Sequence, residues 1–419
     1  MPEVHLKKGP KGPGPKSEEV FRREALCGAH NYSPIPVALT KGEGMRVWDV
    51  DGNDYFDFLS SYSAVNQGHC HPKIVEALKA QSEKLTVTTR HFHTEAFAEY
   101  AEYITNLFGY DKVLPMNSGV EAGETACKLA RKWGYLKKNI PENQAKIVFA
   151  KDNYWGRSIA AISSSTDPYC RTQFGPFIPG FLTVPYDNLE VLEKVFREDP
   201  TICGFMVEPV QGEAGIIVPK PGYLKGVRDL CTKYKVLWID DEIQAGLGRT
   251  GALLTVHYEN VKPDIVCLAK SLSGGMMPVS AVLADDEVML CMEPGEHEST
   301  FSGSPLGCKI ALAALKVLVD EKLPENARRM GEILDEELKK LPKEVITEVR
   351  GKGLFRAIVV NKDDGYSAWE LCLRLRDNGL LCKHTHGYII RLTPPLIITE
   401  AQLRECCTIL LNTINSFKK

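Results

Sequence analysis

Four short, continuous apolar runs constrain what this chain can fold into more than any other feature. Each is four or five residues long, and runs of that length are typical of strands buried on both faces of a sheet. Segments with apolar residues at helical spacing lie between them, at residues 189–197 and 223–234. This alternation of strand and helix predicts an α/β fold with a mostly parallel sheet and helices on both sides. The four runs are residues 146–150, 204–207, 236–239 and 265–268.

The length of the chain, 419 residues, exceeds what one ordinary core can organise, so at roughly 100–200 residues per domain we expect about two to three domains. From about residue 312 the pattern changes to long charged helices around an apolar run at 357–360, which predicts a smaller α+β domain. The first twenty residues combine Lys with Pro and Gly and contain no apolar core. We therefore expect a flexible arm there, neither a secretory signal nor a typical transit peptide, and a cytosolic protein, with mitochondria as the alternative location.

Charge and hydropathy exclude several classes of protein. A net charge of −3 provides no basic surface for nucleic acid or for an anionic membrane. Hydrophobic residues make up 44% and charged residues 25%, the balance of a soluble globular protein, and no apolar run is long enough to cross a bilayer. The 13 cysteines include no Cys-x-x-Cys pair, so we expect buried, reduced thiols, with Cys170 as the one candidate for a reactive thiol.

Polar side chains follow each apolar run at the point where the strand should end. In chain order they are Tyr154 and Arg157, Glu208, Asp240 and Asp241, and Lys270. Ligands of parallel α/β sheets collect beyond the carboxyl ends of the strands. We therefore expect these carboxylates, the amine, the aromatic ring and the guanidinium to share one rim of the sheet.

The amine of Lys270 is the most unusual of these groups, because lysine seldom lies inside a protein unless it is paired or covalently used. Loss of hydration would lower its pKa and make it a nucleophile toward a carbonyl. A buried carboxylate such as Asp241 can keep a pyridoxal ring protonated at nitrogen, and the turn at 116–121 opens a helix whose free amides suit a phosphate. Taken singly, these features also fit a surface lysine, a helix N-cap and an ordinary capped helix; together they indicate pyridoxal phosphate.

Five motifs in a fixed order carry a family resemblance. The chain resembles the class III aminotransferases, which use pyridoxal 5′-phosphate. The motifs are Asn-Ser-Gly-Val-Glu-Ala at 117–122, Asn-Tyr-Trp-Gly-Arg at 153–157, Glu-Pro-Val-Gln-Gly-Glu-Ala-Gly at 208–215, Asp-Glu-Ile-Gln at 241–244 and Lys-Ser-Leu-Ser-Gly-Gly at 270–275.

This resemblance implies a type I pyridoxal-phosphate fold, in which the large domain has a mixed, mostly parallel sheet of seven strands. The large domain would span residues 71–310, and the small domain would combine residues 21–70 and 311–419, after an arm at 1–20. The resemblance also implies a homodimer with shared active sites. We expect no metal, nucleic acid or membrane as partner.

The cofactor positions follow from the same resemblance. Lys270 would bind the cofactor covalently and move the proton, and Asp241 would hold the pyridine nitrogen. Tyr154 would stack on the ring, Gln244 would reach its phenolic oxygen, and Thr300 of the partner subunit would touch the phosphate. The remaining positions, at the phosphate and around the ring, are Ser118, Gly119, Val120 and Glu208.

Three further segments, at 28–32, 58–72 and 391–396, resemble the branch of the family that acts on ornithine. The reaction implied is a ping-pong transfer of the δ-amino group of L-ornithine to 2-oxoglutarate. Its products are glutamate and glutamate 5-semialdehyde, which cyclises to pyrroline-5-carboxylate.

The substrate positions implied by this branch are five. Tyr32 and Arg157 would bind the α-amino and α-carboxylate groups of ornithine, and Tyr62 would line the pocket. Glu213 would pair with Arg391 until a substrate carboxylate takes its place.

The chain departs from the usual family pattern at two places, and other functions are alternatives to the transfer from ornithine. Ser-Thr-Phe-Ser-Gly-Ser-Pro at 299–305 differs from the usual family segment, and Asp240 stands where relatives often have a small or apolar residue, so we expect Asp240 to point away from the ring. Family branches acting on 4-aminobutyrate or acetylornithine share the cofactor positions. A related aminomutase should lack the segments around Tyr32 and Arg391, and a non-catalytic scaffold should lack Lys270.

Overall fold

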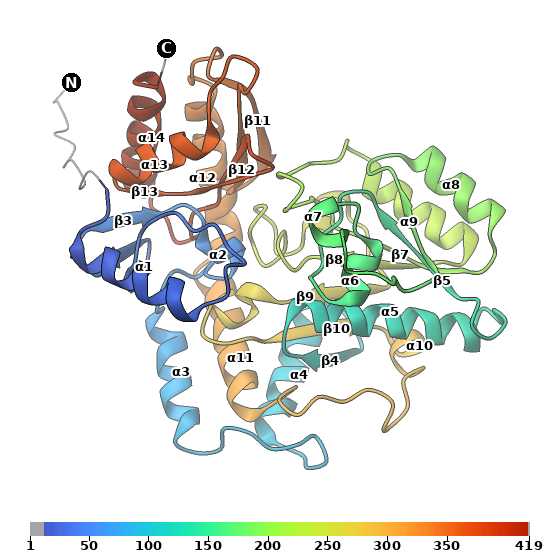
Figure 1. Ribbon diagram of the computed structural model, residues 1–419. Coiled ribbons are helices and arrows are strands. Elements are labelled where there is room, and N and C mark those ends of the chain that lie inside the picture. Colours follow the sequence, from blue (N-terminus) through green and yellow to red (C-terminus); the bar gives the residue numbers. More distant parts are fainter. Residues whose placement is uncertain (1–11, 418–419) are drawn as a thin grey trace.

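A seven-stranded sheet forms the centre of the molecule in the computed structural model, which describes residues 12–417 (Figure 1). Strands β9, β8, β7, β5 and β6 are parallel to one another, whereas β10 runs antiparallel to both β9 and β4. In spatial order the strands are β4 (Lys112–Met116), β10 (Ser280–Ala284), β9 (Ile265–Leu268), β8 (Leu237–Asp241), β7 (Ile202–Val207), β5 (Lys146–Ala150) and β6 (Phe181–Val184). This mixed, mostly parallel sheet confirms the predicted α/β class.

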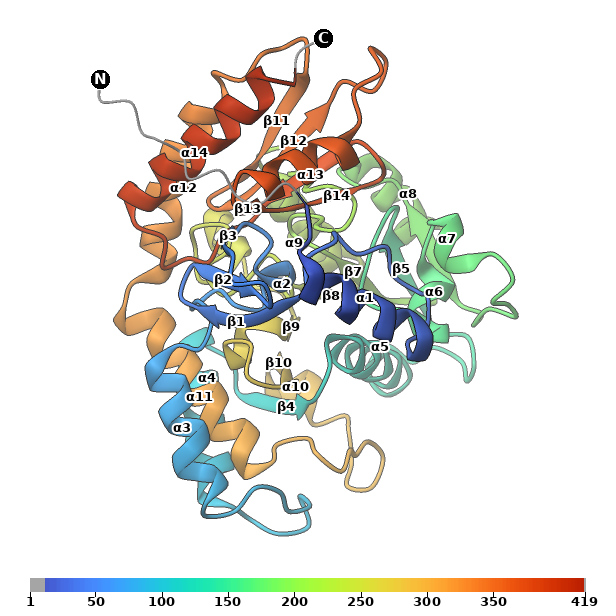
Figure 2. The ribbon, with the colours of Figure 1, turned by 60° about the vertical axis from the view of Figure 1, so that its left-hand side comes forward.

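The smaller sheets join segments that lie far apart in the chain (Figure 2). One has the order β1 (Leu39–Glu43), β2 (Arg46–Asp49), β3 (Asp54–Asp57) and β13 (Leu380–Leu381), so that a C-terminal strand completes an N-terminal sheet. The other has the order β11 (Ile346–Lys352), β12 (Phe355–Val360), β15 (Ile389–Leu392) and β14 (Lys383–Thr385). The predicted apolar run at 357–360 is the end of β12.

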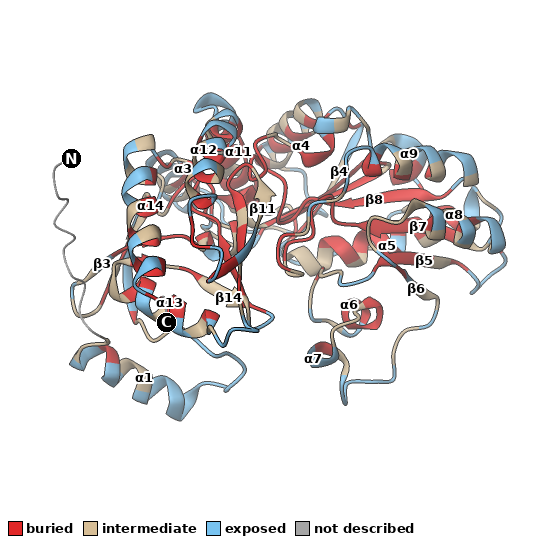
Figure 3. Ribbon diagram, turned by 90° about the horizontal axis from the view of Figure 1, so that it is seen from above, coloured by how far each residue is buried: buried red, intermediate tan, exposed pale blue. Residues whose placement is uncertain are grey.

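The inner strands of the large sheet are covered on both sides, which is why they have no solvent-exposed face (Figure 3). Every residue of β7, β9 and β10 is buried. The predicted runs at 146–150 and 265–268 coincide with β5 and β9. Strand β8 continues through two residues that the sequence placed after its end, because Asp240 and Asp241 still pair with β7 and β9.

Helices pack against the large sheet and against one another. Around the sheet lie α5 (Gly119–Leu136), α6 (Ile159–Ser164), α7 (Pro168–Arg171), α8 (Leu189–Glu198), α9 (Tyr223–Tyr234) and α10 (Asp286–Met289). Helices α3 (Pro72–Ser82), α4 (Glu95–Phe108) and α11 (Pro305–Asp320) form a separate packed group. The rest are α1 (Pro15–Cys27), α2 (Ser60–Ser63), α12 (Leu323–Leu338), α13 (Ala368–Asp377), α14 (Glu400–Asn415) and the 3-10 turns η1 (Thr255–Glu259) and η2 (Lys270–Ser273).

The expected arm at residues 1–20 needs a correction. Residues 1–11 lie outside the described part of the chain, but residues 15–20 form the first turns of α1. Pro15 occupies the first helical turn, where a proline costs no hydrogen bond. The Asp51 carboxylate accepts bonds from the amides of Lys16 at 3.1 Å and Ser17 at 3.0 Å, so a distant residue supplies the cap that the local sequence lacks.

The cysteines are unpaired in the described part of the chain, and all but Cys27 and Cys70 are buried. Cys170 lies 3.2 Å (Sγ) from Oδ2 of Asp167, and burial raises the pKa of its thiol. The structure therefore gives Cys170 neither the exposure nor the lowered pKa of a reactive thiol. Among the described residues, no helix has the length and apolar character needed to cross a membrane.

Candidate active site

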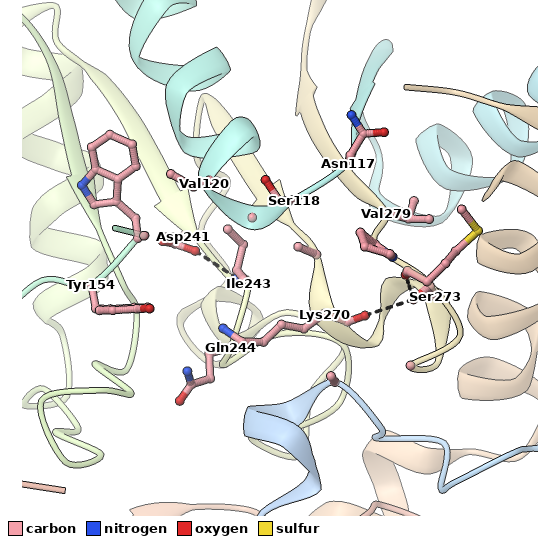
Figure 4. Close-up of a pocket in the computed structure, with 18 of the residues that line it drawn as sticks. Asn117, Ser118, Val120, Tyr154, Asp241, Ile243, Gln244, Lys270, Ser273 and Val279 are labelled. Atoms are coloured by element: carbon pink, nitrogen blue, oxygen red, sulfur yellow. Dashed lines mark hydrogen bonds between the residues drawn. The ribbon is translucent and has the colours of Figure 1, made fainter. Parts of the chain in front are cut away.

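A cavity of about 560 Å³ opens at the carboxyl ends of the parallel strands (Figure 4). It brings together eight of the nine positions that the sequence assigned to a cofactor. These are Ser118, Gly119, Val120, Tyr154, Glu208, Asp241, Gln244 and Lys270. The rest of its wall comes chiefly from apolar side chains and from the turns that follow β8 and β9.

Lys270 enters this cavity from the end of β9. Its backbone has φ +50°, a left-handed conformation that is uncommon outside glycine and that clusters at functional sites. Figure 4 shows its side chain extending into the space near Tyr154, Gln244 and Asp241. Burial lowers the pKa of the Lys270 amine, against the opposing effect of the nearby Asp241 and Glu208 carboxylates.

Asp241 reaches the same space from the neighbouring strand β8. Its Oδ1 accepts a hydrogen bond from the Ile243 amide at 3.0 Å, which fixes the carboxylate. Burial raises the pKa of Asp241 to about 6, while that amide bond and Lys270 act in the opposite direction. Asp240 lies outside the cavity lining, fully buried, and neither of its oxygens has a hydrogen-bond partner among residues 12–417.

The N-terminus of α5 closes one end of the cavity. Ser118 and Glu121 form a capping box in which the Ser118 amide donates to Glu121 Oε2 at 2.6 Å. The amides of Gly119 and Val120 have no acceptor among the described residues. These free N–H groups and the helix dipole favour an anion such as a phosphate. Asn117, which the sequence did not single out, ties this turn to Ser299 Oγ at 2.7 Å.

Glu208 and Gln244 shape the opposite side. The Glu208 carboxylate accepts bonds from the amides of Tyr154 at 3.1 Å and Gly212 at 3.0 Å, and burial, followed by Asp241, raises the pKa of Glu208 to about 8. A Cβ at Gly212 would lie 2.3 Å from Gln244 Oε1, so a larger residue there would displace the Gln244 amide from this position. The Arg157 guanidinium lies 5.5 Å from the centre of the Tyr154 ring.

This set of groups fits pyridoxal phosphate. The free amides of α5 suit the phosphate, Asp241 suits a protonated pyridine nitrogen, and Lys270 suits an aldehyde. No hydrogen bond or ion pair occupies the Lys270 amine among the described residues, so it is available for such a bond. A Cβ at Gly119 would approach Ile243 to 3.3 Å, which shows how closely the helix start and the β8 turn approach each other.

An ion pair forms a second constellation beside the cavity. Arg391 on β15 is buried, and its Nη1 donates to Glu213 Oε2 at 2.8 Å. The Arg391 guanidinium also lies 4.8 Å from the centre of the Tyr62 ring. Tyr62 and Tyr32 line a neighbouring cavity of about 610 Å³, in which Tyr32 is 71% exposed.

Two further predicted residues also lie outside the cavity lining within one chain. Thr300 is exposed on the loop before α11 and does not line the cavity. Arg157 is exposed, although its side chain borders Tyr154. The segment at 276–279 was missed as part of the wall, because its apolar side chains carry no chemical signal in the sequence.

The fold and this site together define a pyridoxal-phosphate-dependent enzyme, and comparisons with known proteins narrow the class. A family described as "Aminotransferase class-III" matches residues 27–414. The chain is 63% identical to "Ornithine aminotransferase, mitochondrial" of Drosophila melanogaster, over 96% of this chain and 93% of that protein. The chain belongs to the class III aminotransferases, which are pyridoxal-phosphate enzymes.

Solved structures agree with this family. An ornithine aminotransferase from Toxoplasma gondii ME49 has a TM-score of 0.94 at 45% identity, covering 96% of this chain and 95% of that one. An acetylornithine aminotransferase from Elizabethkingia anophelis has a TM-score of 0.87 at 50% identity, covering 96% and 99%. Because these two relatives are named for different amine donors, the donor of this chain is argued from the residues of the substrate site.

Proposed function

We propose that this protein transfers the δ-amino group of L-ornithine to 2-oxoglutarate by a ping-pong reaction. The products are glutamate and glutamate 5-semialdehyde, which cyclises to pyrroline-5-carboxylate. The observation that carries the proposal is the Arg391–Glu213 pair at 2.8 Å, with Tyr62 over the guanidinium. The match to ornithine aminotransferases along nearly the whole chain supports it.

The residues of the first cavity have defined tasks in such a reaction. When bound, the cofactor supplies an aldehyde that takes up the amino group and a ring that withdraws electrons from the adjacent carbon. Lys270 would remove and return the proton at that carbon, and burial assists because it lowers the pKa of the amine. Asp241 would hold the proton at the pyridine nitrogen, and Gly119 and Val120 would bind the phosphate through their amides. Tyr154 would cover one face of the ring.

Substrate selection is assigned to the Arg391–Glu213 pair. Ornithine reacts at an amine on an unbranched carbon, whereas 2-oxoglutarate carries a carboxylate next to its reacting carbon. A buried arginine binds that carboxylate well. Glu213 neutralises Arg391 while ornithine is bound and yields when 2-oxoglutarate arrives. Tyr32 and Arg157 bind the α-amino and α-carboxylate ends of ornithine.

The test of this selection is Glu213→Ala. Removal of the carboxylate leaves Arg391 free for α-amino acids, so the first half-reaction with glutamate should become much faster, while that with ornithine should change little. Stopped-flow spectra of the holoenzyme with each amine measure both rates. Glu348→Ala, which removes another arginine-paired carboxylate at 3.0 Å from Arg350, is the matched control. If the rate with glutamate is unchanged in Glu213→Ala, Glu213 does not control the access of α-amino acids to Arg391.

The alternative amine donors are acetylornithine and 4-aminobutyrate. The Elizabethkingia relative supports acetylornithine, whereas Tyr32, Tyr62 and Glu213 favour a donor with a free α-amino group. Side-by-side kcat/KM values for ornithine, acetylornithine and 4-aminobutyrate decide among them. A higher value for either alternative would reject the ornithine assignment.

We also propose a homodimer in which Thr300 of the partner subunit contacts the phosphate. The exposure of Thr300 and its absence from the cavity lining in one chain support this arrangement. The division into a large domain at 71–310 and a small domain at 21–70 and 311–419 belongs to the same proposal. The sheet that joins β3 to β13 supports it.

The cellular location is proposed to be mitochondrial, in place of the cytosolic expectation. The name of the Drosophila relative supports this. Imaging of the full-length protein with a C-terminal tag checks it, and a uniform cytosolic signal would contradict it.

A further inference from the structure

The segment Ser60–Ser63 (α2) has a left-handed backbone that no feature of the sequence predicts. Its four residues have φ values of +49°, +46°, +60° and +73°. None is glycine, and for L-residues a run of left-handed conformations is disfavoured because Cβ approaches the following carbonyl oxygen. Such a turn persists only where the surrounding structure holds it.

The Asp57 carboxylate, at the end of β3, holds the start of this left-handed turn. Its Oδ1 accepts hydrogen bonds from the amides of Leu59 at 2.8 Å and Ser60 at 2.9 Å. Its Oδ2 lies 2.7 Å from Nε2 of His69, so both oxygens are engaged and the carboxylate is fixed. Asp57 is 7% exposed, which strengthens these bonds.

The other side of the turn is fastened to the strand that carries Arg391. Ser60 Oγ donates to the Thr393 carbonyl at 2.6 Å, and the Thr393 amide donates to the Phe58 carbonyl at 2.9 Å. The turn therefore places Tyr62 over the Arg391 guanidinium, which lies 4.8 Å from the centre of the Tyr62 ring. The position of Tyr62 depends on the same contacts that force the left-handed backbone.

We propose that Asp57 is a positioning residue for substrate binding. It holds the left-handed turn, and the turn fixes Tyr62 against Arg391 at the carboxylate-binding end of the pocket. This inference rests on the proposed function, since it assigns that end of the pocket to Arg391. Asp57 itself acts through Tyr62 and has no direct task at the reacting atoms.

A double-mutant cycle tests the proposal with the holoenzyme. Loss of the carboxylate in Asp57→Ala should raise KM for 2-oxoglutarate about tenfold with little change in kcat. The turn would then no longer hold Tyr62 at the carboxylate-binding end of the pocket, and binding of this substrate would weaken. The cofactor absorption spectrum should stay that of the wild type. If Asp57 acts through Tyr62, the double variant Asp57→Ala/Tyr62→Ala should have the same KM as Tyr62→Ala alone.

Asp49→Ala provides the matched control. Asp49 is also a buried carboxylate of this sheet, and it holds a different turn by accepting from the amides of Asp51 at 3.0 Å and Asn53 at 2.8 Å. Its removal should lower the melting temperature, and its effect on KM should add to that of Tyr62→Ala. If the rise in KM of Asp57→Ala came from a general loss of structure, Asp49→Ala should raise KM to the same extent.

Additive effects of Asp57→Ala and Tyr62→Ala on KM would overturn the proposal, as would a wild-type KM in Asp57→Ala. If Asp57→Ala does not fold, Asp57→Asn replaces it in the same cycle, since its amide oxygen can still accept from the turn and should give a smaller but non-additive rise. KM for 2-oxoglutarate is measured with whichever amine donor reacts best. A preference for another donor therefore rejects the ornithine assignment without deciding the role of Asp57.

Discussion

Two adjacent carboxylates of β8 have opposite environments. Asp241 lines the cavity and has one oxygen bonded to the Ile243 amide, whereas Asp240 lies on the other face of the strand without a partner. Alternation along a strand sends neighbouring side chains to opposite faces, so only one of the two can serve the site. The sequence predicted that Asp241 would be this residue.

Exchange of each carboxylate for an amide separates their roles. Asp241→Asn should lower the rate of the half-reaction with ornithine by several orders of magnitude, because a neutral amide cannot keep the pyridine nitrogen protonated. Asp240→Asn should change this rate little. Rapid-mixing absorbance of the holoenzyme gives both rates. The reverse ranking would mean that Asp240 faces the ring.

Asp240 should instead affect the pH dependence of stability. Burial, and then the charge of Glu242, raise the pKa of Asp240 well above its usual range. The folded protein therefore keeps a proton that the unfolded chain releases above a pKa of about 3.9, so stability falls as pH rises beyond that value. Asp240→Asn removes this loss and should stabilise the protein more at pH 8 than at pH 5.

Urea unfolding of the two proteins at both pH values measures this difference. Asp229→Asn on α9 is the control, because the Asp229 side chain is 64% exposed and should show no such dependence. An equal effect of Asp240→Asn at both pH values would contradict a buried, protonated carboxyl.

At the scale of elements, the start of α5 combines stability with binding. The Ser118 side chain accepts from the Glu121 amide, as the Ser367 side chain accepts from the Glu370 amide at the start of α13. Loss of such a cap costs about 1 kcal/mol, so Ser118→Ala and Ser367→Ala should lower the free energy of unfolding of the cofactor-free protein alike. Only Ser118→Ala should also weaken cofactor binding, which fluorescence titration measures. If the two variants bind the cofactor with equal affinity, the Ser118 cap makes no contribution to the phosphate site.

The elements that the sequence predicted well are those whose patterns are local. Strand β9 and helix α9 match residue for residue, because continuous apolar runs and helical spacing depend on near neighbours. The cofactor positions stay a prediction that came mainly from the family resemblance, and eight of the nine line one cavity. Most of these eight lie where a buried strand ends or a helix begins, which is a local pattern.

Features that depend on distant residues could not be predicted. The two residues of β13 pair with β3 more than three hundred positions earlier, and no local pattern marks so short a strand. The left-handed turn at Ser60–Ser63 has no glycine to signal it, because its conformation is imposed by Asp57 and Thr393. The first turn of α1 was missed since its cap comes from Asp51.

At the scale of the whole molecule, two exposed aromatic residues lie on segments that approach each other beside Thr300. Phe92 is 69% exposed and Phe301 is 58% exposed. The two segments approach each other, because the Leu306 amide at the start of α11 donates to the Thr86 carbonyl at 3.3 Å and a Cβ at Gly303 would lie 3.2 Å from Cδ of Arg90. Exposed apolar patches commonly mark protein interfaces, and these two side chains lie near the residue proposed to complete the partner's phosphate site.

The double variant Phe92→Asp/Phe301→Asp should therefore weaken the proposed dimer and, with it, catalysis. Charges in an apolar interface cost desolvation energy, so sedimentation should show more monomer. Since a monomer lacks the partner's Thr300, activity per chain should fall as protein is diluted, and cofactor should dissociate in parallel. Tyr169→Asp, at a site 91% exposed on α7, should change neither quantity. A fully active, cofactor-loaded monomer of the double variant would show that one chain builds the whole site.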